Sequence, residues 1–288
     1  MSSSDYTIDG KDKSPIVIGG LGGSGTRLVT SLVQDMGVSM GGQLNGTLDN
    51  LWFSLLFVRR SILLKPEKEI DKLIWLFTNA MRHGERVPKH LRKLVIEAAR
   101  FGRDPVLPLE VLKGAYESML MTSPSESVSR YWGWKQPNTH VMVGMLNRYY
   151  PSMKYIYVAR NGLDMAFSEN QNQFRYFWGD LLLEGDTSRS PTNALRYWVA
   201  SYKRLLDEAS KLGDRIHILN YDRLCREPLL QLKQLKSFVG IDVDPVYLSE
   251  LAATIKAPET LGRYREHDCS QFDSEDIEFV RQMGFTID

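Results

Sequence analysis

Residues 16–29 of the sequence, IVIGGLGGSGTRLV, join an apolar run to a glycine-rich segment and the start of a helical pattern. A strand that leads through such a turn into a helix places backbone N–H groups, and the positive end of the helix, around an anion such as a phosphate. The alternative is a tight strand-to-helix turn without a ligand, but glycine at this density is costly in an ordered segment. The segment therefore predicts a phosphate-binding loop.

Two known phosphate-loop patterns match this segment only in part. Gly20, Gly22 and Gly25 satisfy the dinucleotide pattern GxGxxG, but no strand with an acidic end follows about 20 residues later, as that pattern requires. Gly20 and Gly25 also have the spacing of the triphosphate loop, but Thr26-Arg27 stands where that loop has lysine followed by serine or threonine. A loop for a less highly charged phosphate remains.

A second candidate phosphate site is VARNGLDMAFS, residues 158–168. Arg160 follows a predicted strand at 154–159, where ligands collect in open α/β sheets, and Ser168 is expected about two turns into the next helix. An arginine and a hydroxyl in this arrangement can hold one phosphate from two sides. The alternative is an ordinary helix entry, in which Asn161 caps the helix and Arg160 makes a surface ion pair.

The elements that position these segments alternate between strands and helices. Short apolar or β-branched runs predict strands at 16–19, 132–135, 154–159 and 215–219, and apolar residues three and four apart predict helices between them. This alternation predicts an α/β fold with a parallel sheet covered on both faces. We expect residues 1–14 to be a disordered lead and 15–288 a single domain with a helical insertion at about 48–125, in which Arg59-Arg60 lies on a solvated helix face.

Composition excludes several classes of protein. The net charge of +1 gives no general attraction to nucleic acid or to an anionic membrane. No apolar run approaches the ~18 residues of a membrane span, and no His/Cys spacing suits a metal site. Two cysteines, Cys225 and Cys269, exclude a disulfide scaffold and suit a reducing compartment, although one disulfide between them stays open. We expect a cytoplasmic protein, with its oligomeric state left open.

The glycine-rich segment 16–29 and the arginine segment 158–168 together resemble the sulfotransferases that use 3′-phosphoadenosine 5′-phosphosulfate (PAPS). Residues 23–27 (GSGTR) resemble the loop that holds the 5′-phosphosulfate, and residues 160–168 match the motif R-[ND]-x-x-D-x-x-x-S that holds the 3′-phosphate. Three more segments are similar to family segments in the same order: 134–137 (WKQP), 220–224 (NYDRL) and 261–265 (LGRYR). The resemblance implies a three-layer, P-loop-like α/β fold with a central parallel sheet and helical insertions.

The resemblance also implies a set of site residues. Those expected to bind the nucleotide are Gly22, Gly23, Ser24, Gly25, Thr26, Arg27, Arg160, Ser168, Tyr221, Gly262 and Arg263. Lys135 and Arg27 are expected to offset the negative charge that develops on the leaving phosphate, without a metal. Asp49 is the preferred candidate for the base, with His140 and Glu110 as alternatives.

One position departs from the family pattern. Gly23 stands where the family usually has lysine or arginine. Either Arg27 and Lys135 supply the missing charge, which we favour, or the chain binds the nucleotide with weak activity.

The implied reaction moves a sulfuryl group from PAPS to a hydroxyl or amine of an acceptor such as a carbohydrate or a small metabolite. Residues 169–179 (ENQNQFRYFWG) either line the acceptor pocket or form a helix end packed on a neighbour. Two other functions stay open. A P-loop small-molecule kinase would need the lysine that the loop lacks, and a nucleotide-binding module without catalysis would explain Gly23.

Overall fold

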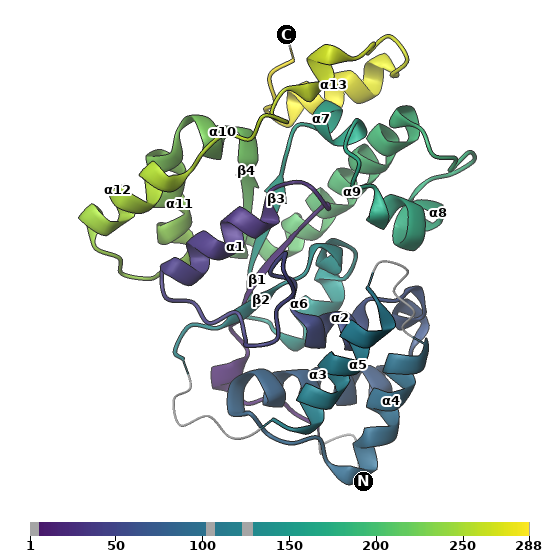
Figure 1. Cartoon of the computed structure of the whole chain (residues 1–288), viewed down its shortest axis with the longest axis vertical. Coiled ribbons are helices and arrows are strands. Elements are labelled where there is room, and N and C mark those ends of the chain that lie inside the picture. The colour runs from purple at the N-terminus through teal and green to yellow at the C-terminus, as the bar shows by residue number, and fades with distance from the viewer. Residues whose placement is uncertain (1–5, 102–106, 123–128, 288) are drawn as a thin grey trace. The chain divides into compact units, whose positions relative to one another are not determined.

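The structure is a computed structural model that describes residues 6–101, 107–122 and 129–287 (Figure 1). It divides into two compact units. The first contains Met1–Val17, Val38–Gln136 and Met145–Met153, and the second contains Ile18–Gly37, Pro137–Gly144 and Lys154–Asp288. Each unit is described by itself below.

A four-stranded sheet has the strand order β2-β1-β3-β4. The strands are β1 (Ile16–Gly20), β2 (Gly133–Lys135), β3 (Lys154–Ala159) and β4 (Ile216–Asn220). β3 and β4 are parallel, with the register running from Tyr155 opposite Ile216 to Ala159 opposite Asn220. All residues of β1 and nearly all of β3 are buried, which explains why both read as continuous apolar runs. The predicted α/β fold with a parallel sheet flanked by helices is confirmed, and each predicted strand lies within one residue of its observed bounds.

The first unit is mainly helical between Leu51 and Leu120. Its elements there are α2 (Leu51–Phe57), the 3₁₀ turn η3 (Arg60–Leu64), α3 (Glu67–His83), η4 (Lys89–Leu91), α4 (Arg92–Phe101) and α5 (Leu109–Leu120). Their core is aromatic. Phe53 stacks on Trp134 with ring centroids 5.4 Å apart, and Phe77 meets the same indole edge-on at 5.0 Å. This packing fixes β2, and therefore the backbone of Lys135, against α2 and α3.

Where the sequence predicts a disordered lead, the structure places residues 10–12 in a 3₁₀ turn, η2 (Gly10–Asp12). Asp12 is 1% exposed, and its carboxylate accepts from Arg82 Nε at 2.8 Å and contacts His83 Nε2 at 2.8 Å. A buried carboxylate needs such partners, so this ion-pair cluster holds the segment on α3. The remaining part of the lead, residues 1–5, lies outside the described residues.

The second unit contains most of the sheet and its covering helices. They are α1 (Thr26–Asp35), η5 (Pro137–Val141), α7 (Gly162–Ala166), the π-helix η6 (Gln173–Trp178), α8 (Gly179–Leu182), α9 (Pro191–Leu212), η7 (Gly213–Arg215), α10 (Tyr221–Arg226), α11 (Pro228–Val239), α12 (Pro245–Thr254), η8 (Arg263–Glu266) and α13 (Ser274–Gln282). α6 (Val143–Tyr149) begins in this unit and continues in the other. The N-cap of the long α9 is Ser190, whose side chain accepts from Asn193 N, and the helix buries Trp198 and Tyr202.

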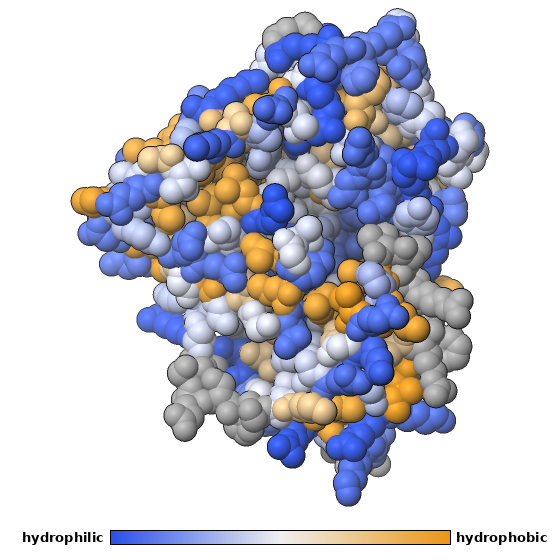
Figure 2. Space-filling model, in the orientation of Figure 1, coloured by the Kyte–Doolittle hydropathy of each residue, from blue (hydrophilic) through white to orange (hydrophobic). Residues whose placement is uncertain are grey.

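The surface is mainly hydrophilic on the face drawn in Figure 2, with exposed apolar side chains over α11 and α12 at the left of the view. Leu230, Val246 and Tyr247 are the large exposed hydrophobic residues of these two helices. Cys225 and Cys269 are free thiols. Among the residues that the structure describes, no helix is long and apolar enough to cross a membrane.

Candidate active site

The glycine loop between β1 and α1 has a backbone that only glycine adopts readily. Gly23 and Gly25 have φ values of +94° and +98°. A Cβ on Gly25 would lie 2.1 Å from ring carbons of Tyr221, and a Cβ on Gly23 would lie 3.1 Å from Ser168 Oγ. Both glycines are therefore required by backbone conformation and by a close neighbour. The second unit thus brings together loop residues with Ser168 and Tyr221, which are more than 140 positions away in the sequence.

This geometry accounts for the departure from the family pattern at Gly23. A lysine there would need a left-handed backbone and would place its Cβ in tight contact with Ser168 Oγ, so the loop in this conformation disfavours the usual cation. Arg27, one of the two residues expected to supply the missing charge, is exposed on the first turn of α1.

Gly23→Ala is expected to lower the free energy of unfolding more than Gly37→Ala does. Both positions have φ near +100°, so each substitution carries a left-handed strain of about 1–2 kcal/mol. A Cβ on Gly37 meets nothing within 4 Å, so only the Gly23 variant adds the contact with Ser168. Urea denaturation measures both, and equal losses would contradict this constraint. Gly23→Lys is likewise expected to weaken nucleotide binding rather than raise turnover.

Two features at the start of α1 suit an anion. The N-cap of α1 is Gly25, and no side chain accepts from the first turn of the helix. Ser24 is 1% exposed, and its buried hydroxyl has no hydrogen-bond partner in the described part of the chain. An unsatisfied buried hydroxyl is costly, and an anion at this helix end would satisfy it. Thr26 begins the helix, and its carbonyl accepts from Thr30 Oγ1 at 2.7 Å.

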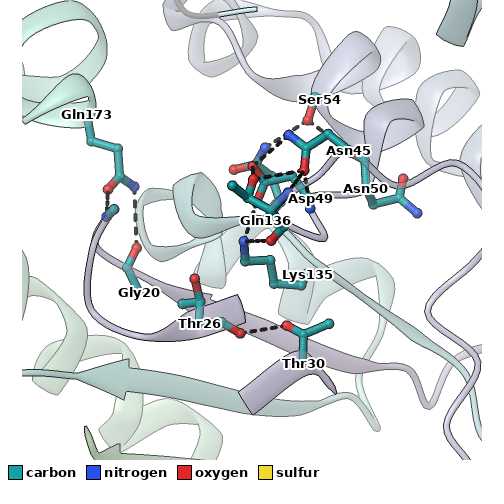
Figure 3. Close-up of polar contacts among 12 residues, drawn as sticks. Gly20, Thr26, Thr30, Asn45, Asp49, Asn50, Ser54, Lys135, Gln136 and Gln173 are labelled. Atoms are coloured by element: carbon teal, nitrogen blue, oxygen red, sulfur yellow. Dashed lines mark hydrogen bonds and ion pairs between the residues drawn. The ribbon is translucent and has the colours of Figure 1, made fainter. Parts of the chain in front are cut away.

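Gln173 holds the other side of the glycine loop (Figure 3). The N–H of Gly22 donates to Gln173 Oε1 at 2.5 Å, and Gln173 Nε2 donates to the carbonyl of Gly20 at 3.3 Å. Gln173 is 6% exposed and is the first residue of the π-helix η6, a form often found at functional sites. The N–H of Gly22, which the sequence predicts to face the phosphate, is therefore bonded to this amide in the structure.

The Gln173 contact was missed because nothing in the sequence pairs residue 173 with the loop. The only signal was the run of amides in residues 169–179. The structure places Asn170, Gln171 and Gln173 beside Leu21 and Gly22, around a hollow of only about 10 Å³. That space holds no more than a water molecule, and Gln173 supports the loop from this side. A role of residues 169–179 in lining the acceptor pocket stays a prediction.

Arg160 lies at the carboxyl end of β3 in a buried polar network. It is 4% exposed, and its Nη2 donates to Asp164 Oδ2 at 3.2 Å, to Thr260 Oγ1 at 3.1 Å and to the Thr260 carbonyl. Asp164 in turn accepts from the N–H groups of Gly262 at 2.8 Å and Tyr264 at 3.3 Å. The arginine motif and the distant segment 261–265 are thus joined through one carboxylate. The reading of Arg160 as a surface residue is excluded by its burial.

Two details of this network matter for binding. The Nε of Arg160 is buried without a hydrogen-bond partner among the described residues, although the same guanidinium is otherwise well bonded. Arg263 donates from Nη1 to the Phe167 carbonyl at 3.5 Å, beside the Arg160 motif. Its pKa is lowered, first by burial and then by the neighbouring Arg160 charge. Two guanidinium groups held this close favour an anion between them.

Ser168 lies just past the C-terminal end of α7, whereas the sequence predicts it about two turns into this helix. α7 ends at Ala166, and Phe167 is its C-cap. The side-chain amide of Gln171 donates to the carbonyls of Met165 at 2.7 Å and Ser168 at 3.0 Å, which satisfies carbonyls that a continued helix would bond. The early end of α7 turns Ser168 back toward Gly23.

Tyr221 is another of the expected nucleotide-binding residues in the second unit. It is 7% exposed and begins α10, where Asn220 accepts from Arg223 N as the helix cap. Burial raises the pKa of Tyr221 to about 12, so the phenol is neutral at physiological pH. Its ring lies against Gly25, and the Arg160 guanidinium lies 5.8 Å from the ring centroid. The aromatic ring thus bridges the two phosphate motifs.

The first unit brings together two other predicted residues, Asp49 and Lys135 (Figure 3). Lys135 ends β2, is 2% exposed, and donates from Nζ to Asp49 Oδ1 and to the Thr47 carbonyl, the latter at 2.9 Å. Asp49 Oδ2 accepts from Thr47 Oγ1 at 2.9 Å and from Asn45 Nδ2 at 3.1 Å. The carboxylate is therefore fixed by one ammonium group and two polar side chains.

The Asp49 loop carries backbone strain. Leu48 has φ of +63° and is the one non-glycine residue with positive φ among the described residues. A bulky residue in the left-handed region costs about 1–2 kcal/mol and persists only where surrounding contacts enforce it. Here the contacts are the bonds from Asn45 N to the Asp49 carbonyl at 3.1 Å and from Leu48 N to the Asn45 carbonyl at 2.9 Å. Strain of this kind clusters at functional sites, which favours Asp49 as the reactive carboxylate.

The two alternative bases lie in unsuitable surroundings. His140 is 1% exposed, with Nδ1 2.9 Å from the Pro137 carbonyl and Nε2 3.2 Å from the Tyr197 hydroxyl. Burial lowers the pKa of His140 from 6.5 to about 4, so the ring is neutral and fully used in packing. Glu110 is exposed in the first turn of α5, where a carboxylate suits the helix end.

Below pH 6.5 the protein is expected to lose stability through His140. The unfolded chain takes up a proton near pH 6.5 and the folded chain only near pH 4, so the free energy of unfolding falls as pH drops through this window. The full loss is on the order of 3 kcal/mol. Denaturant titrations at pH 7, 5.5 and 4.5 measure it, with His140→Gln as the comparison. If the free energy of unfolding of His140→Gln falls with pH as steeply as that of the unmodified protein, groups other than His140 cause the loss of stability.

Comparisons with known proteins identify the family. A sequence profile described as the sulfotransferase family matches residues 15–245, well over half of the chain. The protein belongs to the sulfotransferase family, and it is therefore a transferase. A search of curated protein sequences gives no match.

Solved structures of other sulfotransferases are similar to this chain. The sulfotransferase domain of the Synechococcus PCC 7002 olefin synthase is similar over 98% of this chain and 98% of its own, with a TM-score of 0.53 and 16% identity. A sulfotransferase of Mycobacterium tuberculosis H37Rv is similar over 92% of this chain and 77% of its own, with a TM-score of 0.44 and 14% identity. The first of these likenesses shows the α/β fold of sulfotransferases.

Proposed function

We propose that this sulfotransferase uses PAPS as donor and transfers the sulfuryl group to a hydroxyl or amine of a small-molecule or glycan acceptor. The observation that carries the proposal is a pair of buried polar atoms, Ser24 Oγ and Arg160 Nε, one in each predicted phosphate motif of the second unit. Neither atom has a hydrogen-bond partner among the residues that the structure describes. Two orphaned donors fit a nucleotide that carries phosphates at both ends.

The 5′ end of the nucleotide is assigned to the glycine loop. The hydroxyls of Ser24 and Thr26 and the free N-terminal N–H groups of α1 would bind its phosphate, with Gly23 and Gly25 allowing close backbone approach. Arg27, exposed on the same turn, would offset charge on the leaving phosphate. In the family, a lysine or arginine at the position of Gly23 usually supplies this positive charge. Here the N-terminal dipole of α1 and the Arg27 side chain would supply it.

The 3′-phosphate is assigned to Arg160 and Ser168, with Gly262 and Arg263 closing over it. Asp164 holds this group together, because it bonds both the Arg160 guanidinium and the backbone of the 261–265 segment. Tyr221 would pack beside the nucleotide with its ring, between the two phosphate positions.

Asp49 and Lys135 are proposed to act on the acceptor side of the reaction. PAPS, when bound, supplies a sulfuryl group on a phosphate leaving group. The Asp49 carboxylate would take the proton of the attacking hydroxyl or amine, and the Lys135 ammonium would keep that carboxylate oriented and offset developing negative charge. The ion pair and the strained Leu48 backbone favour a preorganised role for this cluster.

Two measurements test the proposal. Calorimetry with 3′-phosphoadenosine 5′-phosphate (PAP) is expected to give one-site binding, with ATP bound far more weakly. Labelled sulfate should then move from PAPS to members of a panel of alcohols, amines and sugars. Preference for ATP over PAP would contradict the proposal and support a P-loop kinase.

A nucleotide-binding module without catalysis is the second candidate. It is favoured by one observation, the missing side chain at Gly23, which the loop conformation enforces. Tight PAP binding with no transfer to any acceptor would establish it.

A further inference from the structure

Arg59 differs from its sequence-based prediction. The pair Arg59-Arg60 was expected on a solvated helix face, but Arg59 is 7% exposed, while Arg60 is exposed. α2 ends at Phe57, and the chain turns inward before η3, which carries the Arg59 side chain into the first unit. A buried arginine is rare unless it is paired, so its partners need to be identified.

The Arg59 guanidinium has only one hydrogen bond in the described part of the chain, from Nη1 to the Leu55 carbonyl at 3.1 Å. Among those residues no carboxylate lies within ion-pair distance of it. Burial lowers the pKa of Arg59 to about 10, and the charge of Glu69 offsets this effect only in part. The Glu69 carboxylate is itself bonded to Lys65. No Arg59 nitrogen is among the buried atoms that lack a partner in the described part of the chain, so the donors not bonded to Leu55 reach solvent, where an anion can replace water.

A cavity of about 550 Å³ lies against Arg59. Its size is in the range of small-molecule sites, about 300–1,000 Å³. The apolar part of its wall is formed by Leu64, Pro66, Leu94 and Ala98, from η3, the following turn and α4. Leu64 is 88% exposed although it lines the cavity, so its apolar side chain has no cover. The cavity thus combines a cation at one point with apolar walls elsewhere.

The other charged groups that line the cavity already have partners. Lys65 pairs with Glu69, and Glu97 lies 3.9 Å from Lys93 Nζ on the exposed side of α4. Of the charged residues that line the cavity in the described part of the chain, Arg59 is the one without an ion-pair partner. A guanidinium pairs best with a carboxylate, which it binds through two parallel N–H bonds. The apolar walls require that this carboxylate carry an apolar body.

We propose that this cavity binds an amphipathic carboxylate, with the head group on Arg59 and the aliphatic body against Leu64, Pro66, Leu94 and Ala98. The site lies within the first unit and does not depend on the proposed transfer reaction. The carboxylate is either one end of the sulfate acceptor or part of a separate ligand, and the experiment distinguishes these sources.

The test is calorimetry of the full chain with decanoate below its micelle concentration. Decanoate is expected to bind, whereas decanol and decyltrimethylammonium bind at least tenfold more weakly. Arg59→Gln should weaken decanoate binding by about tenfold or more, because a charge-assisted pair is lost. Arg60→Gln, which changes the exposed neighbour, is the matched control and should change the dissociation constant less than twofold.

A second variant keeps the test informative if Arg59→Gln fails to fold. Leu64→Asn alters an exposed residue and should weaken decanoate severalfold at unchanged melting temperature. Absence of decanoate binding, or equal binding of decanol, would overturn the proposal.

The source of the carboxylate is tested with 10-hydroxydecanoate. Transfer of labelled sulfate to its hydroxyl, lost in Arg59→Gln, would assign the cavity to the acceptor. Decanoate binding without such transfer would assign it to a separate ligand. Either result supports the carboxylate site, and the binding measurement stands even if PAPS proves not to be the donor.

Discussion

Arg160→Ala is expected to reduce the affinity for PAP by at least tenfold and to lower the free energy of unfolding by about 3–5 kcal/mol. The two losses have different origins. Affinity falls because a charge-assisted contact to the 3′-phosphate is removed. Stability falls because the carboxylate of Asp164, 1% exposed, loses the arginine with which it is paired.

Separate variants distinguish the two losses. Arg160→Ala combined with Asp164→Asn removes the unpaired charge, so it should recover part of the stability but none of the PAP affinity. Arg281→Ala, at an exposed pair with Glu278 on α13, is the matched control and should alter stability by less than about 0.5 kcal/mol. Calorimetry and urea denaturation measure these values. An unchanged dissociation constant for PAP in Arg160→Ala would refute the role given to this residue.

Lys135→Ala is expected to lower turnover by about 10²–10³-fold while leaving PAP affinity within about twofold. The structure gives a reason for the size of this effect. Lys135 fixes Asp49 through one ion pair and the Asp49 loop through the Thr47 carbonyl, so its loss disturbs both charge and position. Single-turnover kinetics with PAPS, once an acceptor is found, measure the chemical step directly.

The Asp49–Lys135 pair also has a double-mutant test. If the two residues act as a unit, Asp49→Asn should cost about as much as Lys135→Ala, and the double variant little more than either. Lys113→Ala on α5, an exposed lysine 3.8 Å from Glu117, is the control and should leave turnover unchanged. Equal losses of turnover and PAP affinity would instead give Lys135 a ground-state binding role.

The strands were predictable from sequence because each is a short apolar run next to a turn. β3 was predicted with its observed bounds, and the glycine loop was placed correctly between β1 and α1. Local pattern is informative there because burial of a parallel strand leaves a continuous apolar signal. The end of α7 was not predictable, because it depends on hydrogen bonds from the Gln171 side chain to the carbonyls of Met165 and Ser168.

The site was predictable only where a motif is contiguous. Arg160, Asp164 and Ser168 lie in one segment, so their closeness follows from the sequence, and their binding of a phosphate stays a prediction. Gln173 and Thr260 were missed because their roles depend on contacts with residues about 100 or more positions away. Arg59 was assigned to the surface because a charged pair beside a helix normally is solvated, and no local signal reports that the chain turns inward.

The uncapped start of α1 links nucleotide supply to protein stability. Gly25 offers the helix no side-chain acceptor, so a bound phosphate would act as the missing cap. Any ligand that binds only the folded chain raises its unfolding free energy, by about 2.7 kcal/mol at a concentration 100 times the dissociation constant. The amount of folded protein in a cell would then rise and fall with the supply of its nucleotide, independently of how fast the acceptor is consumed.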